Sequence, residues 1–189
     1  MRILGSCVLA LALVALLSTG VGAQDEKTKL LCGFNSDADL EGLGFTDECD
    51  HAIVKDKELV TEGDGALKIT AKKDEAAAGF DIGPAMPREK RPIGWEKFDT
   101  LSVDVNNLSK ENVNVTLRFD DINSKSYQTR ANITKSVAAG KSTVKVSLKD
   151  MKKDNGDALD VSKLKRFVLF FVGKASTEVV FDNLRLEKE

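Results

Sequence analysis

Few residues of this 189-residue chain could carry out acid–base or nucleophilic chemistry. The chain has one histidine, His51, and no Gly-x-Ser-x-Gly sequence to present a nucleophilic serine. Glycoside hydrolysis needs two carboxylates that face each other across the bond to be cleaved. Asp120 and Asp121 are adjacent, so on a strand they point to opposite faces. The pattern Glu-x-Asp-x-x-Glu is absent. We therefore predict that the chain is not an enzyme.

A set of polar residues has the parity expected for one shared sheet face. The segment that holds Arg118 and Asp120 alternates apolar and polar residues, so both side chains point away from the core. Asp104 has the same parity in the preceding segment and joins them if both segments lie in one sheet. Gln128 and Arg130 extend the set. The alternative is a solvated sheet face whose charges pair between strands.

Composition excludes several classes of protein. There are 28 Lys and Arg residues against 30 Asp and Glu residues, a net charge of -2. Nucleic-acid binding needs clustered positive charge, which this balance does not provide. Hydrophobic residues make up 42% of the chain, too many for a disordered protein.

Residues 1–23 have the pattern of a secretory signal peptide. Arg2 is followed by an apolar run over residues 8–17 and then by small residues, with Val21 and Ala23 before the predicted cleavage point. The alternative is an uncleaved membrane anchor, but a span needs about 20 apolar residues and this run is shorter. We expect an exported protein that is secreted, periplasmic or at the cell surface, with no membrane-spanning segment after cleavage.

Cleavage leaves residues 24–189, a length that suits one domain, and the loss of Arg2 takes the net charge to -3. Two cysteines remain, and in an exported chain such a pair predicts a disulfide between Cys32 and Cys49. The alternative is two buried thiols. A zinc site on these cysteines and His51 would lack a fourth ligand.

The mature chain is predicted to consist mainly of strands. Alternation with period 2 marks four segments: residues 66–71, 101–105, 113–120 and 144–148. Residues 167–172 are apolar on both faces, which predicts a central strand, and residues 177–186 shift their alternation near Asp182, which predicts a bulge. Helical periodicity is nearly absent. The pattern therefore predicts an all-β fold, a sandwich or jelly roll.

Four segments carry a family resemblance. In order they are residues 30–42, 60–69, 94–107 and 179–186. Together they resemble galactose-binding-like β-sandwich domains, in particular carbohydrate-binding modules of families 11 and 30 and the accessory domains of agarase-type enzymes. The resemblance covers nearly the whole mature chain. It implies a jelly-roll β-sandwich of two antiparallel sheets.

The resemblance also implies a structural calcium ion between the first strand, a Glu-Gly turn and the last strand. The candidate ligands carried over by position are Asn35, Asp37, Glu62 and Asp182. Calcium takes six to eight oxygen ligands, which carboxylates and carbonyls supply. Family members usually have an acidic residue at the position of Asn35, so the site here would have one charge fewer. The alternative is that Glu62 is a turn residue and Asp182 accepts backbone hydrogen bonds.

The function that the resemblance implies is that of an exported, non-catalytic module that binds a polysaccharide or oligosaccharide on the concave sheet face. The candidate ligand-binding residues are Asp104, Arg118, Asp120, Tyr127 and Arg130. Tyr127 is the candidate for stacking on a sugar, whereas Trp95 is expected to cover one end of the sandwich. We expect a monomer. The alternative is an exported structural or protein-interaction sandwich without sugar binding.

Overall fold

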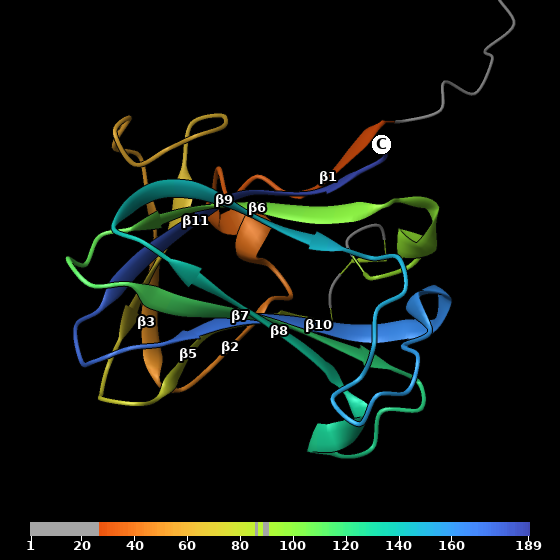
Figure 1. The fold of residues 1–189 in the computed structure, drawn as a ribbon. Helices are drawn as coiled ribbons and strands as arrows, with labels where there is room; N and C mark the ends of the chain where they lie inside the picture. The colour runs from red at the N-terminus through yellow and green to blue at the C-terminus, as the bar shows by residue number, and fades with distance from the viewer. Residues whose placement is uncertain (1–26, 86, 89–90) are drawn as a thin grey trace, which may run out of the picture.

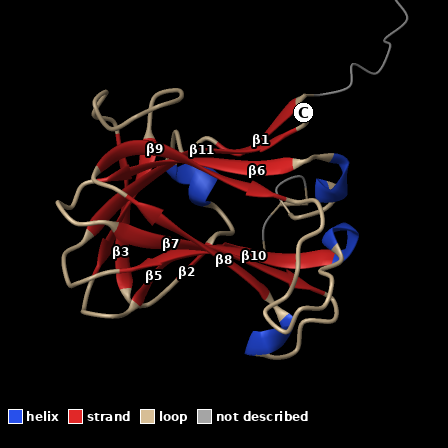
Figure 2. Ribbon diagram, viewed as in Figure 1, coloured by secondary structure: helices blue, strands red, loops and turns tan. Residues whose placement is uncertain are grey.

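Two antiparallel β-sheets packed face to face make up the structure, a computed structural model that describes residues 27–85, 87–88 and 91–189 (Figures 1 and 2). The only helical elements of the described residues are four short 3-10 helices. The prediction of an all-β sandwich is therefore confirmed. The predicted signal peptide, residues 1–23, lies outside the described residues.

One sheet has six strands and the other has five. The six-stranded sheet contains β1 (Thr28–Cys32), β3 (Cys49–Val54), β4 (Ala66–Ala71), β6 (Thr100–Asn107), β9 (Gly140–Ser147) and β11 (Glu178–Glu187). The five-stranded sheet contains β2 (Gly44–Phe45), β5 (Ala77–Ile82), β7 (Val113–Asp121), β8 (Ala131–Val137) and β10 (Leu164–Val172). The four 3-10 helices are η1 (Asp37–Leu40), η2 (Trp95–Lys97), η3 (Tyr127–Thr129) and η4 (Val161–Lys163).

Short links join the two sheets along both of their edges. The strand orders are β3-β4-β11-β6-β9 and β2-β5-β10-β7-β8, and β1 pairs with the part of β11 that follows its β4 pairing. Residues 46–48 connect the edge strands β2 and β3, and residues 138–139 connect the edge strands β8 and β9. Each edge of one sheet is thus tied covalently to the facing edge of the other.

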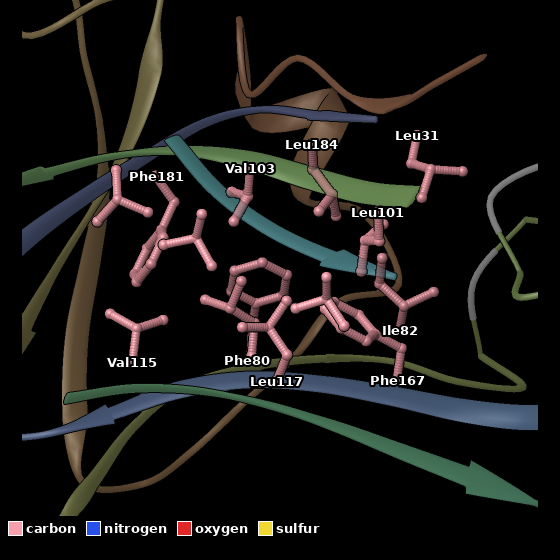
Figure 3. Close-up of a cluster of buried hydrophobic side chains, with 14 of the residues drawn as sticks. Leu31, Phe80, Ile82, Leu101, Val103, Val115, Leu117, Phe167, Phe181 and Leu184 are labelled. Carbon is pink, nitrogen blue, oxygen red and sulfur yellow. The ribbon is translucent and has the colours of Figure 1, made fainter. Parts of the chain in front are cut away.

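The core fills the space between the sheets with apolar side chains from alternate strand positions. Figure 3 shows Val103, Phe181 and Leu184 from the six-stranded sheet facing Phe80 and Leu117 from the five-stranded sheet. All five are fully buried. Burial of such apolar surface is the main driving force for folding.

Trp95 belongs to this core. It is fully buried and packs against Phe167, with 5.5 Å between the ring centroids. The indole is therefore not available to a ligand at the surface.

The predicted strands are found, with one local difference. Ahead of β8, the Thr129 hydroxyl accepts the backbone N–H groups of Lys125 and Ser126, both at 2.9 Å, and the chain turns there to form η3. β10 is central, as predicted, yet its outward-facing Val172 is 44% exposed. The predicted bulge is present: the β11–β6 register shifts between Asp182 and Arg185.

None of the helices among the described residues is long and apolar enough to cross a membrane.

Asp121, at the end of β7, anchors the long loop that precedes η4. Its buried carboxylate forms an ion pair with Lys153 Nζ at 2.9 Å and accepts the backbone N–H of Asp160 at 3.2 Å. The backbone N–H of Asn123 and the hydroxyl of Ser124 satisfy its other oxygen. Asp121 is therefore a structural residue and is not free to act as a catalytic acid.

We predict that Asp121→Asn lowers the free energy of unfolding by roughly 3 kcal/mol, because it leaves the Lys153 ammonium buried without its counter-charge. Burial acts to raise the pKa of Asp121, but the hydrogen bond from Lys153 and those from Asp160, Ser124 and Asn123 lower it overall. The stabilisation is present above the carboxyl's ordinary pKa of about 3.9 and is lost as the pH falls through the lower folded-state value.

Urea unfolding measured at pH 7 and at pH 3 tests this prediction. The wild-type protein should lose more stability on acidification than Asp121→Asn. Equal losses in the two proteins would contradict it.

Candidate functional site

The candidate site lies on the outward face of the five-stranded sheet. Arg118 and Asp120 alternate with core residues of β7, and Arg130 directly precedes β8. In the strand register, Arg118 lies between Val168 of β10 and Asn132 of β8. We call Arg118, Asp120, Arg130 and Asn132 the arginine patch.

Both arginines of the patch approach the same carboxylate oxygen. Arg118 Nε lies 3.7 Å from Asp120 Oδ1, and Arg130 Nε lies 3.6 Å from it. These distances are those of ion pairs and are too long for hydrogen bonds. The Asp120 side chain is only 4% exposed.

The patch contains buried polar atoms that lack hydrogen-bond partners. They are Arg118 Nε, Asp120 Oδ1, Arg130 Nε and Asn132 Oδ1, four of the six such atoms found among the described residues. Each atom of this kind costs about 1–3 kcal/mol when it is left unsatisfied. Unsatisfied buried groups gathered at one place are a feature of functional sites.

Two further pairs border the patch. Arg166 Nε donates to Asp81 Oδ2 at 2.8 Å, and its Nη2 donates to the same oxygen. On the other side, Asn132 Nδ2 donates to Asp154 Oδ2 at 2.6 Å. None of these residues was predicted from the sequence to belong to the site. For Asp81, its position between Phe80 and Ile82, two core residues of β5, indicates that it faces outward.

The charges around Arg118 oppose one another. Burial lowers the pKa of Arg118, and the positive charges of Arg130 and Arg166 act in the same direction. Asp120 and Tyr127 raise it. Arg118 thus has the positive charges of Arg130 and Arg166 near its own.

Tyr127 is the exposed aromatic residue next to the patch. It lies in η3, its side chain is 62% exposed, and its carbonyl accepts the backbone N–H of Arg130 at 3.3 Å. The ring is accessible for stacking, as a sugar-binding residue requires. The structure therefore places Tyr127 next to Arg118, Asp120 and Arg130.

Asp104 is not part of this site, so the expectation that it joins Arg118 and Asp120 is wrong. Its strand, β6, belongs to the six-stranded sheet, whereas β7 belongs to the five-stranded sheet. The outward faces of the two sheets are on opposite sides of the sandwich. Asp104 instead accepts hydrogen bonds from Thr143 at 2.8 Å and Asn183 at 3.0 Å.

The predicted disulfide is not formed. Cys32 and Cys49 are both buried, and their sulfurs are not bonded to each other. Cys32 is opposite Leu184 of β11. Cys49 is opposite Ala71 of β4, and the backbone N–H of Ala71 donates to the carbonyl of Thr177, just before β11. Thr177 and Leu184 are seven residues apart along an extended strand, a distance of roughly 20 Å. Bridged cysteines have Cα atoms no more than about 7 Å apart.

Two of the four predicted calcium ligands, Asn35 and Asp182, accept hydrogen bonds from backbone donors. Asn35 Oδ1 accepts the N–H of Asp64 at 2.6 Å and that of Gly65 at 3.2 Å. Asp182 Oδ2 accepts the N–H and the hydroxyl of Thr61, at 2.7 and 2.9 Å, and the N–H of Glu62 at 2.9 Å.

At Asn35 Oδ1 and Asp182 Oδ2, N–H groups therefore point at oxygens that a calcium ion would need as ligands. In the described part of the chain, no three His, Cys, Asp or Glu side chains gather as a metal-binding group. The arrangement ties the loop of residues 61–65 to β11 and to the segment after β1 through hydrogen bonds. Gly63 is needed in this loop: its φ is +68°, and a Cβ there would lie 2.1 Å from Asn35 Oδ1.

We predict that Asn35→Ala lowers the free energy of unfolding by about 1–3 kcal/mol, because two backbone N–H groups lose their acceptor. Asn112→Ala is the matched control, since that exposed amide contacts only Ser136 at 3.3 Å. Thermal unfolding of the wild-type protein in calcium and in chelator should give the same Tm. A higher Tm in calcium would contradict the hydrogen-bonded arrangement and support the ion.

No family model and no curated protein sequence matches the chain. Solved structures do match its fold. A family 11 carbohydrate-binding module from Clostridium thermocellum, in complex with a beta-1,3-1,4-mixed-linked tetrasaccharide, is 15% identical with a TM-score of 0.59, covering 85% of this chain and 95% of the module. The family 11 module of a cellulosomal cellulase of Clostridium thermocellum is 14% identical with a TM-score of 0.58, covering 86% of this chain and 95% of the module.

An exo-beta-agarase is also similar, at 17% identity and a TM-score of 0.63. The match covers 85% of this chain but only 25% of the agarase. The resemblance predicted from the sequence is therefore confirmed for the fold: this chain has the β-sandwich of these carbohydrate-binding modules.

Proposed function

We propose that the chain is an exported, non-catalytic glycan-binding module whose ligand lies on the outward face of the five-stranded sheet. The observation that carries this proposal is the exposed ring of Tyr127 beside the arginine patch, whose buried polar atoms lack partners. The fold shared with carbohydrate-binding modules supports it.

The chemistry of this face suits a sugar. A tyrosine ring stacks on the apolar face of a pyranose, and its hydroxyl remains free to form a hydrogen bond. The guanidinium groups of Arg118 and Arg130 offer several N–H donors in a fixed plane, which can bind neighbouring sugar oxygens at once. Stacking on one side and directional donors on the other are sufficient to orient a single chain.

Binding without catalysis follows from how the carboxylates of this face are used. Asp120 forms ion pairs with Arg118 and Arg130, and Asp81 is held by Arg166. Glycoside hydrolysis needs one carboxyl group that donates a proton and a second group that acts as nucleophile or base. Both carboxylates therefore already have guanidinium partners in this arrangement.

A second candidate function is that of a protein-interaction sandwich. The observation in its favour is an apolar stretch on the same face, where Val172 is 44% exposed and Phe170 lies over Gly79. A ligand seated there would touch β10 and β5 and would not need Tyr127.

Export rests on the pattern of residues 1–23. Expression with an intact secretion pathway, followed by mass spectrometry of the mature protein, should show a chain that begins at Gln24. A protein whose chain still begins at Met1 would contradict cleavage.

We predict that Tyr127→Ala weakens glycan binding about ten-fold, because the stacking surface is lost while the exposed ring contributes little to folding. A glycan array that includes the mixed-linked tetrasaccharide identifies a ligand, and calorimetry measures Kd for the wild type and the variant.

Leu30→Ala is the matched control, since Leu30 is a similarly exposed large residue on β1 of the other sheet. Its Kd should equal that of the wild type. An array without any binding, or unchanged affinity in Tyr127→Ala, would overturn the proposal for this face.

A further inference from the structure

We propose that the arginine patch binds an acidic group, so that the glycan is one that carries carboxylate or sulfate. The inference rests on the proposed glycan-binding function and names the chemical class of its ligand. It is carried by the accessibility of the arginines, by the local balance of charge and by the unsatisfied donors.

The positive charge of the patch exceeds its negative charge. Two guanidinium groups, those of Arg118 and Arg130, share the single carboxylate of Asp120. Of the neighbouring carboxylates, Asp81 is engaged by Arg166. Counted within ion-pair distance, the patch therefore holds two positive charges and one negative charge.

Asp154 does not supply a further counter-charge directly. Its carboxylate accepts the side-chain amide of Asn132 at 2.6 Å and the backbone N–H of Asn132 at 3.2 Å. Its contacts in the structure are therefore with Asn132, and it forms no ion pair with Arg118 or Arg130. An incoming anion would neutralise the surplus charge with full hydrogen-bond geometry.

The arginines are also the groups that a ligand meets first. The side chains of Arg118 and Arg130 are 17% and 27% exposed, whereas that of Asp120 is only 4% exposed. Within the patch, the two arginines are thus more exposed than the carboxylate that they share. Neutral sugar hydroxyls need acceptors as well as donors, but a carboxylate or sulfate ester needs donors only. Pairing of guanidinium with such groups is among the strongest hydrogen-bonded contacts in proteins.

The Nε atoms of both arginines lack a hydrogen-bond partner, although each lies within ion-pair distance of Asp120 Oδ1. Small side-chain movements toward an anion would satisfy these donors. A general attraction between the protein and polyanions is not expected, because the predicted mature chain has a net charge of -3.

Two matched pairs of polymers test the inference. Polygalacturonate and its methyl ester differ in free carboxylate, and dextran sulfate and dextran differ in sulfate. Calorimetry should show binding of at least one acidic polymer at least ten-fold tighter than binding of its neutral partner, and the affinity should fall with added salt. The pair that shows the difference identifies the acidic group.

Three variants separate the arginine patch from general charge effects. Arg130→Gln should weaken binding of the acidic polymer about ten-fold. Lys145→Gln removes the same charge from an exposed residue of β9 on the other sheet and should leave Kd unchanged. Asp120→Asn removes the carboxylate that competes with the ligand for both arginines, so it should bind the acidic polymer more tightly than the wild type. Circular dichroism verifies that each variant is folded.

The outcomes distinguish the inference from the function on which it rests. Equal affinity for acidic and neutral polymers, or binding by a folded Asp120→Asn that is no tighter than that of the wild type, overturns the acidic ligand while glycan binding stands. Failure of every glycan to bind overturns both. Equal weakening by Lys145→Gln and Arg130→Gln overturns the assignment to the arginine patch.

Discussion

Burial of one apolar face of each sheet against the other is the constraint on which the structure depends. It assigns every second strand residue to the core, and so it also decides which residues are left outside. Phe119 of β7 is fully buried, and its neighbours Arg118 and Asp120 must therefore face outward. The candidate site is in this sense a consequence of the core, since its residues occupy the positions that the core does not use.

Outward-facing positions are nevertheless not all solvated. Asp120 is almost completely covered, and its carboxylate lies within ion-pair distance of Arg118 and Arg130. A buried carboxylate is tolerable only with such partners. Its pairing is incomplete, because the distances exceed those of hydrogen bonds. On the other sheet, Asp182 has the opposite character: its carboxylate accepts several donors at hydrogen-bonding distance and stabilises a loop. The contrast separates a site that could accept a ligand from one that is already filled.

The sequence was sufficient to predict strands and faces, because period-2 alternation is a local property. It could not predict which sheet each strand enters. Asp104 and Arg118 have the same parity, but β6 and β7 follow each other in the chain and lie in different layers. The number of cysteines likewise did not indicate how far apart the two sulfurs lie. Cys32 and Cys49 are near in sequence, but they lie at distant levels along the strands of the six-stranded sheet.

The links at both edges of the sandwich have a consequence for recognition. Residues 46–48 and 138–139 bridge the layers on opposite sides, so neither sheet can slide or open without distorting a very short connection. The backbone that carries Arg118 and Asp120 is therefore held in place before any partner arrives. Association with a rigid surface loses little conformational entropy on the protein's side. Selectivity should then come from the shape and charge of the ligand. Only side chains should adjust on binding, and the backbone of the sandwich should be the same in the free and bound states.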